Sequence, residues 1–339
     1  MRLVAGIVAL AACGRGGFDR HDAAVDAGDG AVDELPHVTT APGWTKSVYV
    51  DFSADFTYVA DDFRDGATGE TVVDNQPDKM AVLGAPFGEV LAIGAGRTII
   101  ELSIDRYIEH DFGMHAQDTI NPDDINRMSL VPDAGGMGAR LVFCSSSDGS
   151  GDGMFLVNTS WTVARDMNTN NARAFLWDEA GMVQGTAQVF LGTGNGMFRR
   201  PDDATTIRSG DFRGMLPIAG GMVFVRAIAT DDQRLVRAIW NGSTFVEAEL
   251  TVREAIDFAD GDRPASGLAW AITDLDQLDE VANDGTMTMI ARSSEPAHIW
   301  RAAAVPPIGH ALAQSKRTIY VLETNRALDI DRVLAFTEE

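Results

Sequence analysis

Short apolar runs separated by turn-forming residues constrain the fold of this chain more than any other feature. From Trp44 onward the runs are a few residues long, and Gly, Asp, Asn or Ser stands between them. Helical periodicity is scarce, and we expect a helix only around residues 252–258. The pattern predicts an all-β fold with strands at residues 47–56, 90–104, 140–145, 154–158, 188–191, 222–229, 234–240, 244–250, 286–292, 298–302 and 317–322.

The apolar runs also repeat along the chain. V-F-C-S-S-S-D-G-S-G-D-G-M-F from Val142 and V-F-L-G-T-G-N-G-M-F from Val189 both contain a strand, a glycine-rich turn and Gly-Met-Phe at the start of the next strand. Similar apolar runs start at Val90, Val223, Met287 and Ile319. The mean step of about 46 residues is close to the ~40–50 residues of one propeller blade. We therefore expect a β-propeller with six or seven blades, with tandem β-sandwiches as the alternative.

One stretch carries a family resemblance. L-D-E-V-A-N-D-G-T-M-T-M-I-A-R-S-S-E-P-A-H-I-W-R, from Leu278, has an acidic turn, a strand, a Ser-rich turn and a strand that ends near an aromatic residue. This order resembles the degenerate propellers of the TolB/WD40-like type, in particular the six-bladed TolB type. The resemblance covers residues 250–335 and implies that this part of the chain consists of propeller blades.

The first thirteen residues are typical of a secretory leader. Arg2 is followed by an apolar run, Leu3 to Ala12, that is shorter than the ~20 residues of a membrane-spanning helix. The last four residues, Leu10-Ala11-Ala12-Cys13, resemble the lipobox of bacterial lipoproteins. The resemblance implies a signal peptide at residues 1–12 and a lipid group on the Cys13 thiol. Because Gly rather than Asp follows the cysteine, it also implies delivery to the outer membrane, facing the periplasm or the cell surface.

The segment after Cys13 is acidic and poor in apolar residues. Such a segment cannot bury enough surface to offset the entropy of ordering it. We therefore expect a lipid-anchored disordered tether at residues 13–43 and the β domain at residues 44–339. Each buried methylene of an acyl chain contributes ~0.8 kcal/mol to membrane binding, so two or three chains would hold the protein at a membrane.

The formal net charge of −23, from 50 acidic and 27 basic residues, argues against nucleic acid as a partner. The expected partners are the membrane, through the lipid anchor, and a protein or glycan ligand at the mouth of the propeller. Cys144 lies in an apolar run and is expected to be a buried core residue. His110 and His115 are spaced unfavourably for zinc ligation.

Two stretches contain candidate site residues. Asp148, Ser150 and Asp152 alternate with glycines, which is typical of the first half of a calcium loop and equally of a hairpin turn. Thr159 stands where a calcium loop of the EF-hand type would need Glu. Calcium is thus the one cofactor that we consider.

The second stretch is acidic and consists of Asp274, Asp276, Asp279, Glu280 and Asp284. Paired carboxylates such as Asp276 and Asp279 could catalyse glycoside hydrolysis, and a solvated acidic surface would give the same pattern. The sequence contains no Gly-x-Ser-x-Gly, P-loop, dinucleotide-binding or Cys-x-x-Cys motif. We therefore expect a binding or scaffolding module of the outer cell envelope, with a glycan-active hydrolase as the alternative.

Overall fold

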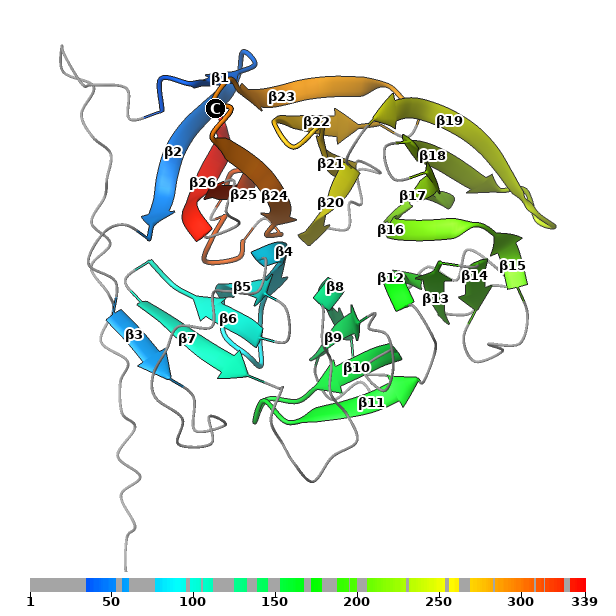
Figure 1. Ribbon diagram of the computed structural model, residues 1–339, viewed down its shortest axis with the longest axis horizontal. Coiled ribbons are helices and arrows are strands. Elements are labelled where there is room, and N and C mark those ends of the chain that lie inside the picture. Colours follow the sequence, from blue (N-terminus) through cyan, green and yellow to red (C-terminus); the bar gives the residue numbers. More distant parts are fainter. Residues whose placement is uncertain are drawn as a thin grey trace, which may run out of the picture. The chain divides into compact units, whose positions relative to one another are not determined.

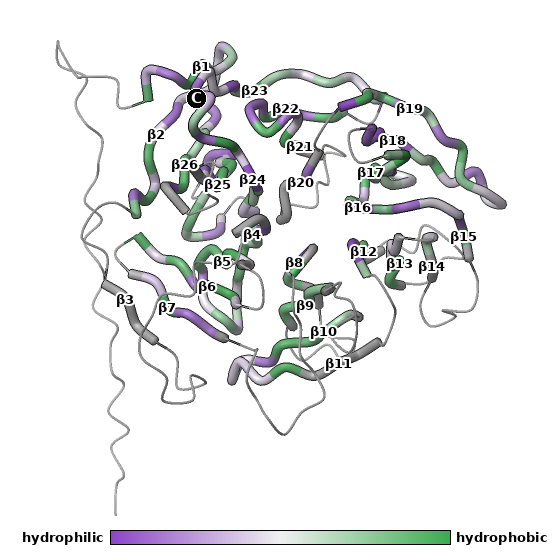
Figure 2. Tube along the Cα trace, viewed as in Figure 1, coloured by the Kyte–Doolittle hydropathy of each residue, from purple (hydrophilic) through white to green (hydrophobic). Residues whose placement is uncertain are grey.

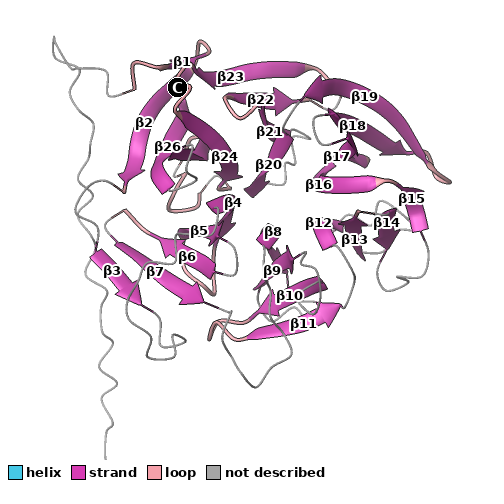
Figure 3. Ribbon diagram, in the orientation of Figure 1, coloured by secondary structure: helices cyan, strands magenta, loops and turns pink. Residues whose placement is uncertain are grey.

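The computed structural model describes residues 35–52, 57–60, 77–95, 98–104, 106–111, 125–132, 139–145, 153–167, 172–178, 188–194, 196–199, 206–229, 232–253, 256–261, 269–282, 284–307, 309–313, 315–325 and 330–339. They form a six-bladed β-propeller (Figure 1). The all-β expectation is confirmed with six blades, and the tandem-sandwich alternative is wrong. Figure 3 shows strands and loops only; none of the residues described belongs to a helix that could cross a membrane.

Each of the first four blades is formed by consecutive strands. Blade one contains β4 (Pro77–Leu83), β5 (Val90–Ala95), β6 (Thr98–Leu102) and β7 (Arg106–Asp111), with β3 (Thr57–Ala60) parallel to β7. Blade two contains β8 (Ile125–Pro132), β9 (Ala139–Ser145), β10 (Gly153–Val157) and β11 (Val163–Met167). Blade three contains β12 (Ala172–Asp178), β13 (Gln188–Thr193), β14 (Gly196–Arg199) and β15 (Thr206–Ser209). Blade four contains β16 (Asp211–Ile218), β17 (Gly221–Ala229), β18 (Asp232–Trp240) and β19 (Phe245–Arg253).

The last two blades include strands from the N-terminal part of the chain. Blade five contains β20 (Ile256–Gly261), β21 (Ala269–Thr273), β22 (Gln277–Val281) and β23 (Met287–Ser293), with β1 (Val38–Thr40) antiparallel to β23. Blade six contains β24 (His298–Val305), β25 (Thr318–Asn325), β26 (Ile330–Glu338) and, at its outer edge, β2 (Trp44–Asp51). The pairing of β2 with β26 closes the ring, because it joins the two ends of the propeller within one blade.

The first strand of every blade lies nearest the centre of the ring (Figure 1). We call β4, β8, β12, β16, β20 and β24 the inner strands. Each inner strand contacts those of the two neighbouring blades. In addition, β20 contacts β4 and β8, which belong to blades that are not its neighbours. The strands therefore approach one another across the axis of the propeller.

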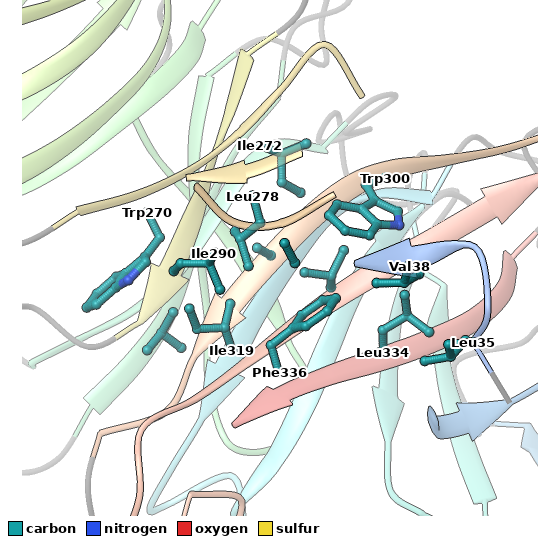
Figure 4. Packing of buried hydrophobic residues seen from close by; sticks show 14 residues of the cluster. Leu35, Val38, Trp270, Ile272, Leu278, Ile290, Trp300, Ile319, Leu334 and Phe336 are labelled. Atoms are coloured by element: carbon teal, nitrogen blue, oxygen red, sulfur yellow. The ribbon is translucent and has the colours of Figure 1, made fainter. Parts of the chain in front are cut away.

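Apolar side chains fill the space between neighbouring blades. Between blades five and six, Trp270 of β21, Trp300 of β24 and Phe336 of β26 belong to one buried cluster (Figure 4). Ile319 of β25 faces this cluster, whereas the next residue, Tyr320, faces the cluster shared with blade one. Both faces of a blade are thus covered, which explains the apolar runs that the sequence shows. Figure 2 shows hydrophobic and hydrophilic residues along the strands.

Every strand expected from the sequence overlaps an observed strand. The repeat is confirmed as well: Gly-Met-Phe opens β10 and β14, the third strands of blades two and three. The starts at 90, 142, 189, 223 and 319 all fall on the second strand of a blade, but Met287 falls on the last strand of blade five. The equivalent strand there is β21. Cys144 on β9 is fully buried, as expected.

The helix expected around residues 252–258 is wrong. Val252 is an exposed residue of the outer strand β19, and Phe258 is a buried residue of the inner strand β20. Their helix-like spacing arises because one blade ends and the next begins between them. Four residues, Asn241 to Thr244, join β18 to β19, and the Asn241 side chain accepts hydrogen bonds from the backbone N–H groups of Ser243 and Thr244.

Residues 35–43, which we expected in the tether, are packed on the propeller. Leu35 and Val38 are 2% and 1% exposed and belong to the cluster between blades five and six (Figure 4). Val38 pairs with Ser293 of β23, and the Lys46 ammonium donates to the carbonyl of Leu35. The folded part of the chain therefore includes residues that precede Trp44. The leader and residues 13–34 lie outside the described residues.

Candidate functional site

A pocket of about 570 Å³ lies on blades five and six. Its walls are the turn between β21 and β22, the end of β23, the loop that follows it, the start of β24 and one residue of β1. The lining residues are Thr39, Asp274, Leu275, Asp276, Arg292, Ser293, Ser294, Glu295, Pro296, His298 and Ile299. Charged and hydroxyl-bearing side chains predominate, so the pocket is suited to a polar ligand.

The turn between β21 and β22 is the most constrained part of the pocket. Asp274 and Leu275 have φ angles of 56° and 62°, the left-handed pair of a tight hairpin turn, although neither residue is glycine. Such a conformation persists where the surroundings hold it. Here the backbone N–H of Trp300 donates to the Leu275 carbonyl at 2.7 Å, and the backbone N–H of Ser293 donates to the Asp276 carbonyl at 2.7 Å. The turn is thus fixed to β24 on one side and to β23 on the other.

Two carboxylates of the pocket are held by arginines. Asp274 lies 3.2 Å from a guanidinium nitrogen of Arg253, and Asp276 lies 3.2 Å from one of Arg292. The second oxygen of Asp276, Oδ1, is buried and has no hydrogen-bond partner among the described residues. A buried acceptor without a partner costs free energy. This oxygen is therefore ready to accept a hydrogen bond from a bound water or ligand.

Behind the pocket lies a buried carboxylate, Glu323 of β25, whose side chain is fully buried. The Trp300 indole donates to its Oε2 at 3.0 Å, and the Arg332 guanidinium donates to its Oε1. His37 and His298 lie 3.8 and 3.9 Å from the same carboxylate. Because His298 also lines the pocket, this buried network supports one wall of the pocket from inside the propeller.

The structure separates the two acids that we named for hydrolysis. Asp276 lines the pocket, whereas Asp279 does not line it and is 2% exposed. The Asp279 carboxylate accepts hydrogen bonds from the Thr273 hydroxyl at 2.7 Å and from the Gln277 amide at 2.8 Å. Asp279 therefore stabilises the β21–β22 hairpin, and the two carboxylates do not face a common ligand.

The remaining acids of the cluster also have local partners. Glu280 lies 3.8 Å from Arg317. Asp284 accepts the backbone N–H of Thr286 at 2.9 Å in the turn before β23, and this hydrogen bond holds the pKa of its carboxyl below the usual value. The cluster is therefore dispersed over a pocket wall, a blade interior and an outer turn.

The other candidates of the sequence analysis lie away from the pocket or outside the described residues. His110 of β7 is buried, stacks on Trp161 with ring centroids 3.5 Å apart and lies 3.3 Å from Glu101. Cys13, His115 and the three residues of the candidate calcium loop, Asp148, Ser150 and Asp152, lie outside the described residues.

Sequence reasoning did not find most of the pocket. The charged and polar residues that it missed include Thr39, Arg292, Glu295, His298 and, behind the wall, Glu323 and Arg332. Arg292 to His298 was interpreted as a Ser-rich turn, and its mixture of charge, hydroxyl and proline between two apolar strands is the signal that could have indicated a binding loop.

No protein-family model matches the chain, and no curated protein is similar to it in sequence. Solved structures resemble it in fold. A gluconolactonase from Xanthomonas campestris, XC5397, is 9% identical with a TM-score of 0.51, over 78% of this chain and 88% of that one. A glucose dehydrogenase is 12% identical with a TM-score of 0.48, over 77% and 96%. The Pan2 WD40 domain from Neurospora crassa is 8% identical with a TM-score of 0.45, over 89% and 98%. At these identities the likeness to the gluconolactonase supports the propeller fold alone.

Proposed function

We propose that the protein is a lipid-anchored binding module of the outer cell envelope and that it performs no chemistry of its own. Its ligand is a glycan of the envelope, held in the pocket on blades five and six. The anchor is supported by the lipobox-like Leu10-Ala11-Ala12-Cys13 sequence. A glycan is favoured over a protein because the pocket is small and because most of its lining residues carry hydrogen-bond donors or acceptors, which suit sugar hydroxyl groups.

The observation that carries this proposal is the pairing of Asp276. Its Oδ2 lies 3.2 Å from the Arg292 guanidinium, and its buried Oδ1 has no partner among the described residues. Because the two side chains hold each other in place, the carboxylate can accept a hydrogen bond from a ligand and the neighbouring arginine can donate one, both from fixed positions. Glycoside hydrolysis requires two carboxyl groups that flank one bond. The Asp279 carboxylate instead accepts a hydrogen bond from Thr273 within the β21–β22 hairpin. The arrangement therefore favours recognition over hydrolysis.

Replacing Cys13 with alanine is expected to release the protein from the membrane. Cys13 is the residue to which the lipobox resemblance assigns the acyl chains, and membrane binding increases with the number of buried methylenes. Intact-mass analysis of the membrane-extracted wild-type protein should show a chain that begins at Cys13 and carries two or three acyl chains. The Cys144→Ala variant should be acylated as the wild type is. An unmodified wild-type chain that begins at Met1 would contradict the anchor.

Binding is tested with soluble muropeptides and lipopolysaccharide-core oligosaccharides, by titration calorimetry on the purified protein. We expect a ligand in this set whose affinity falls about tenfold in Arg292→Ala, because one charge-assisted hydrogen bond is lost. Arg208→Ala, an exposed arginine of β15 outside the pocket, serves as the control and should bind normally. Mass spectrometry of the same mixtures distinguishes the alternative: cleavage that disappears in Asp276→Asn would show a glycan-active hydrolase, and absence of any binding would contradict both functions.

A further inference from the structure

The carboxylates that line the pocket on blades five and six are unequally paired. Three of them, Asp274, Asp276 and Glu295, line it together with one guanidinium, that of Arg292. Arg292 binds Asp276, and Arg253, which does not line the pocket, binds Asp274. Glu295 is different, because its carboxylate has neither an ion pair nor a hydrogen bond with any residue that the structure describes. The pocket therefore contains one carboxylate more than these two arginines neutralise.

The backbone of Glu295 is held in place by the loop that joins β23 to β24. The backbone N–H of Glu295 donates to the Ser293 hydroxyl at 3.2 Å, and the backbone N–H of His298 donates to the Glu295 carbonyl at 3.4 Å. The preceding residue, Ser294, donates to the His37 carbonyl from its backbone N–H at 2.9 Å and from its hydroxyl at 3.0 Å. The loop is thus fixed on both sides of Glu295, which gives the carboxylate a defined place in the pocket wall.

The surroundings of Glu295 strengthen its attraction for a cation. The residue is half-buried, so its charge is screened less by water and salt than the charge of a fully exposed carboxylate. The chain as a whole has a net charge of −23, and such a field raises the concentration of small cations near the surface. A cationic group that enters the pocket therefore gains from Glu295 without breaking an existing ion pair.

An ammonium group fits the pocket better than a metal ion does. Calcium takes six to eight oxygen ligands, and the described residues include no group of three or more His, Cys, Asp or Glu side chains that could hold a metal ion. An ammonium group needs fewer acceptors, because it is compact and has three N–H donors that rotate. Besides the Glu295 carboxylate, the pocket offers Asp276 Oδ1, which is buried and has no partner among the described residues.

We propose that the pocket selects sugars that carry a free, protonated amino group, and that Glu295 is the residue that determines this specificity. The specificity rests on the glycan-binding function proposed for the pocket and names the class of glycan. The ammonium group donates to the Glu295 carboxylate, and Arg292 and the hydroxyl groups of the wall bind the sugar hydroxyls. Acetylation of the amino group removes its charge, so an N-acetylated sugar leaves Glu295 without a cationic partner.

Titration calorimetry on the purified full-length protein tests the proposal. The two probes are the disaccharide of glucosamine and the same disaccharide with both amino groups acetylated, which differ in charge and share the sugar ring. We expect the glucosamine disaccharide to bind about tenfold more tightly, because it adds one charge-assisted hydrogen bond. Sodium chloride should weaken the binding of this disaccharide more than that of the acetylated one, because salt screens the attraction between the charges.

A matched pair of variants separates a specific contact from general attraction to an acidic protein. Glu295→Gln keeps the size of the side chain and removes its charge, and it should bind the two disaccharides about equally. Glu249→Gln removes the same charge from β19, outside the pocket, where the carboxylate is 38% exposed and paired with Arg234. This control should keep the tenfold preference. General attraction would instead fall by the same amount in both variants.

The outcomes distinguish this specificity from the function on which it rests. The specificity is overturned if the acetylated disaccharide binds as tightly as the free amine, or if Glu295→Gln, shown to be folded by an unchanged melting temperature, keeps the preference. It is also overturned if neither disaccharide binds while a muropeptide or a lipopolysaccharide-core oligosaccharide binds and loses affinity in Arg292→Ala. In these three cases the pocket remains a glycan site. Absence of binding by every glycan would overturn both proposals.

Discussion

Replacing Glu323 with alanine is expected to lower the free energy of unfolding by about 3–5 kcal/mol, the range measured when one partner of a buried ion pair is removed. The reason is the network around the fully buried carboxylate. Its loss removes the carboxylate that accepts from the Arg332 guanidinium and the Trp300 indole N–H and that lies close to His37 and His298. Urea unfolding, followed by tryptophan fluorescence, measures the change.

The conservative and exposed variants show whether the charge itself matters. Glu323→Gln keeps the volume and one acceptor oxygen, so its cost should be smaller than that of the alanine variant. Glu247→Ala removes a carboxylate of β19 that pairs with Arg208 of β15 and with Arg226 of β17 at the surface, and it should cost ~0–1 kcal/mol. If Glu323→Ala were no more destabilising than Glu247→Ala, the buried network would not support the pocket wall. If Glu323→Ala weakened ligand binding but left the free energy of unfolding unchanged, the structural role of Glu323 would be contradicted.

Most of the second strands of the blades could be predicted from the sequence, and most of the inner strands could not. β9, β17 and β25 are apolar on both faces because blades cover them on both sides, and such runs are easy to find. The inner strands β4, β8, β12, β16 and β20 were missed. Each has a charged residue near its start, as Arg173 in β12 and Asp257 in β20, which interrupts the apolar pattern.

Only part of the candidate site could be predicted from the sequence, because the register of the paired strands determines which acidic side chains lie close together. Asp276 and Asp279 are three residues apart, but the first ends a turn and the second lies in β22 next to a bulge between Leu278 and Asp279. Sequence spacing alone does not reveal a bulge, and a one-residue shift moves a side chain to the other face of the blade. Glu323 and His37 lie far apart in the sequence and meet only because β1 packs against blades five and six.

Truncation provides the second large effect. A chain that begins at Trp44 should be less stable than one that begins at Leu35, by about 3–5 kcal/mol. Burial of a leucine or valine side chain contributes ~1.5–3 kcal/mol, and the longer chain buries both Leu35 and Val38. The shorter chain also loses the pairing of β1 with β23 and leaves the Lys46 ammonium without the carbonyls of Leu35 and Val38. Urea unfolding of the two chains measures the difference.

A third chain isolates the cause. The Cys13→Ala chain that begins at residue 13 carries the whole acidic segment without the lipid, and we expect its stability to equal that of the chain that begins at Leu35. The double variant Leu35→Ala, Val38→Ala in the Leu35 chain should reproduce most of the loss, because burial rather than chain length is responsible. Equal stability of the Trp44 and Leu35 chains would mean that β1 is a peripheral strand. The expected loss of stability would show that the propeller domain starts before Trp44 and that the tether is correspondingly shorter. The contact between His37 and Glu323 would then belong to the folded domain.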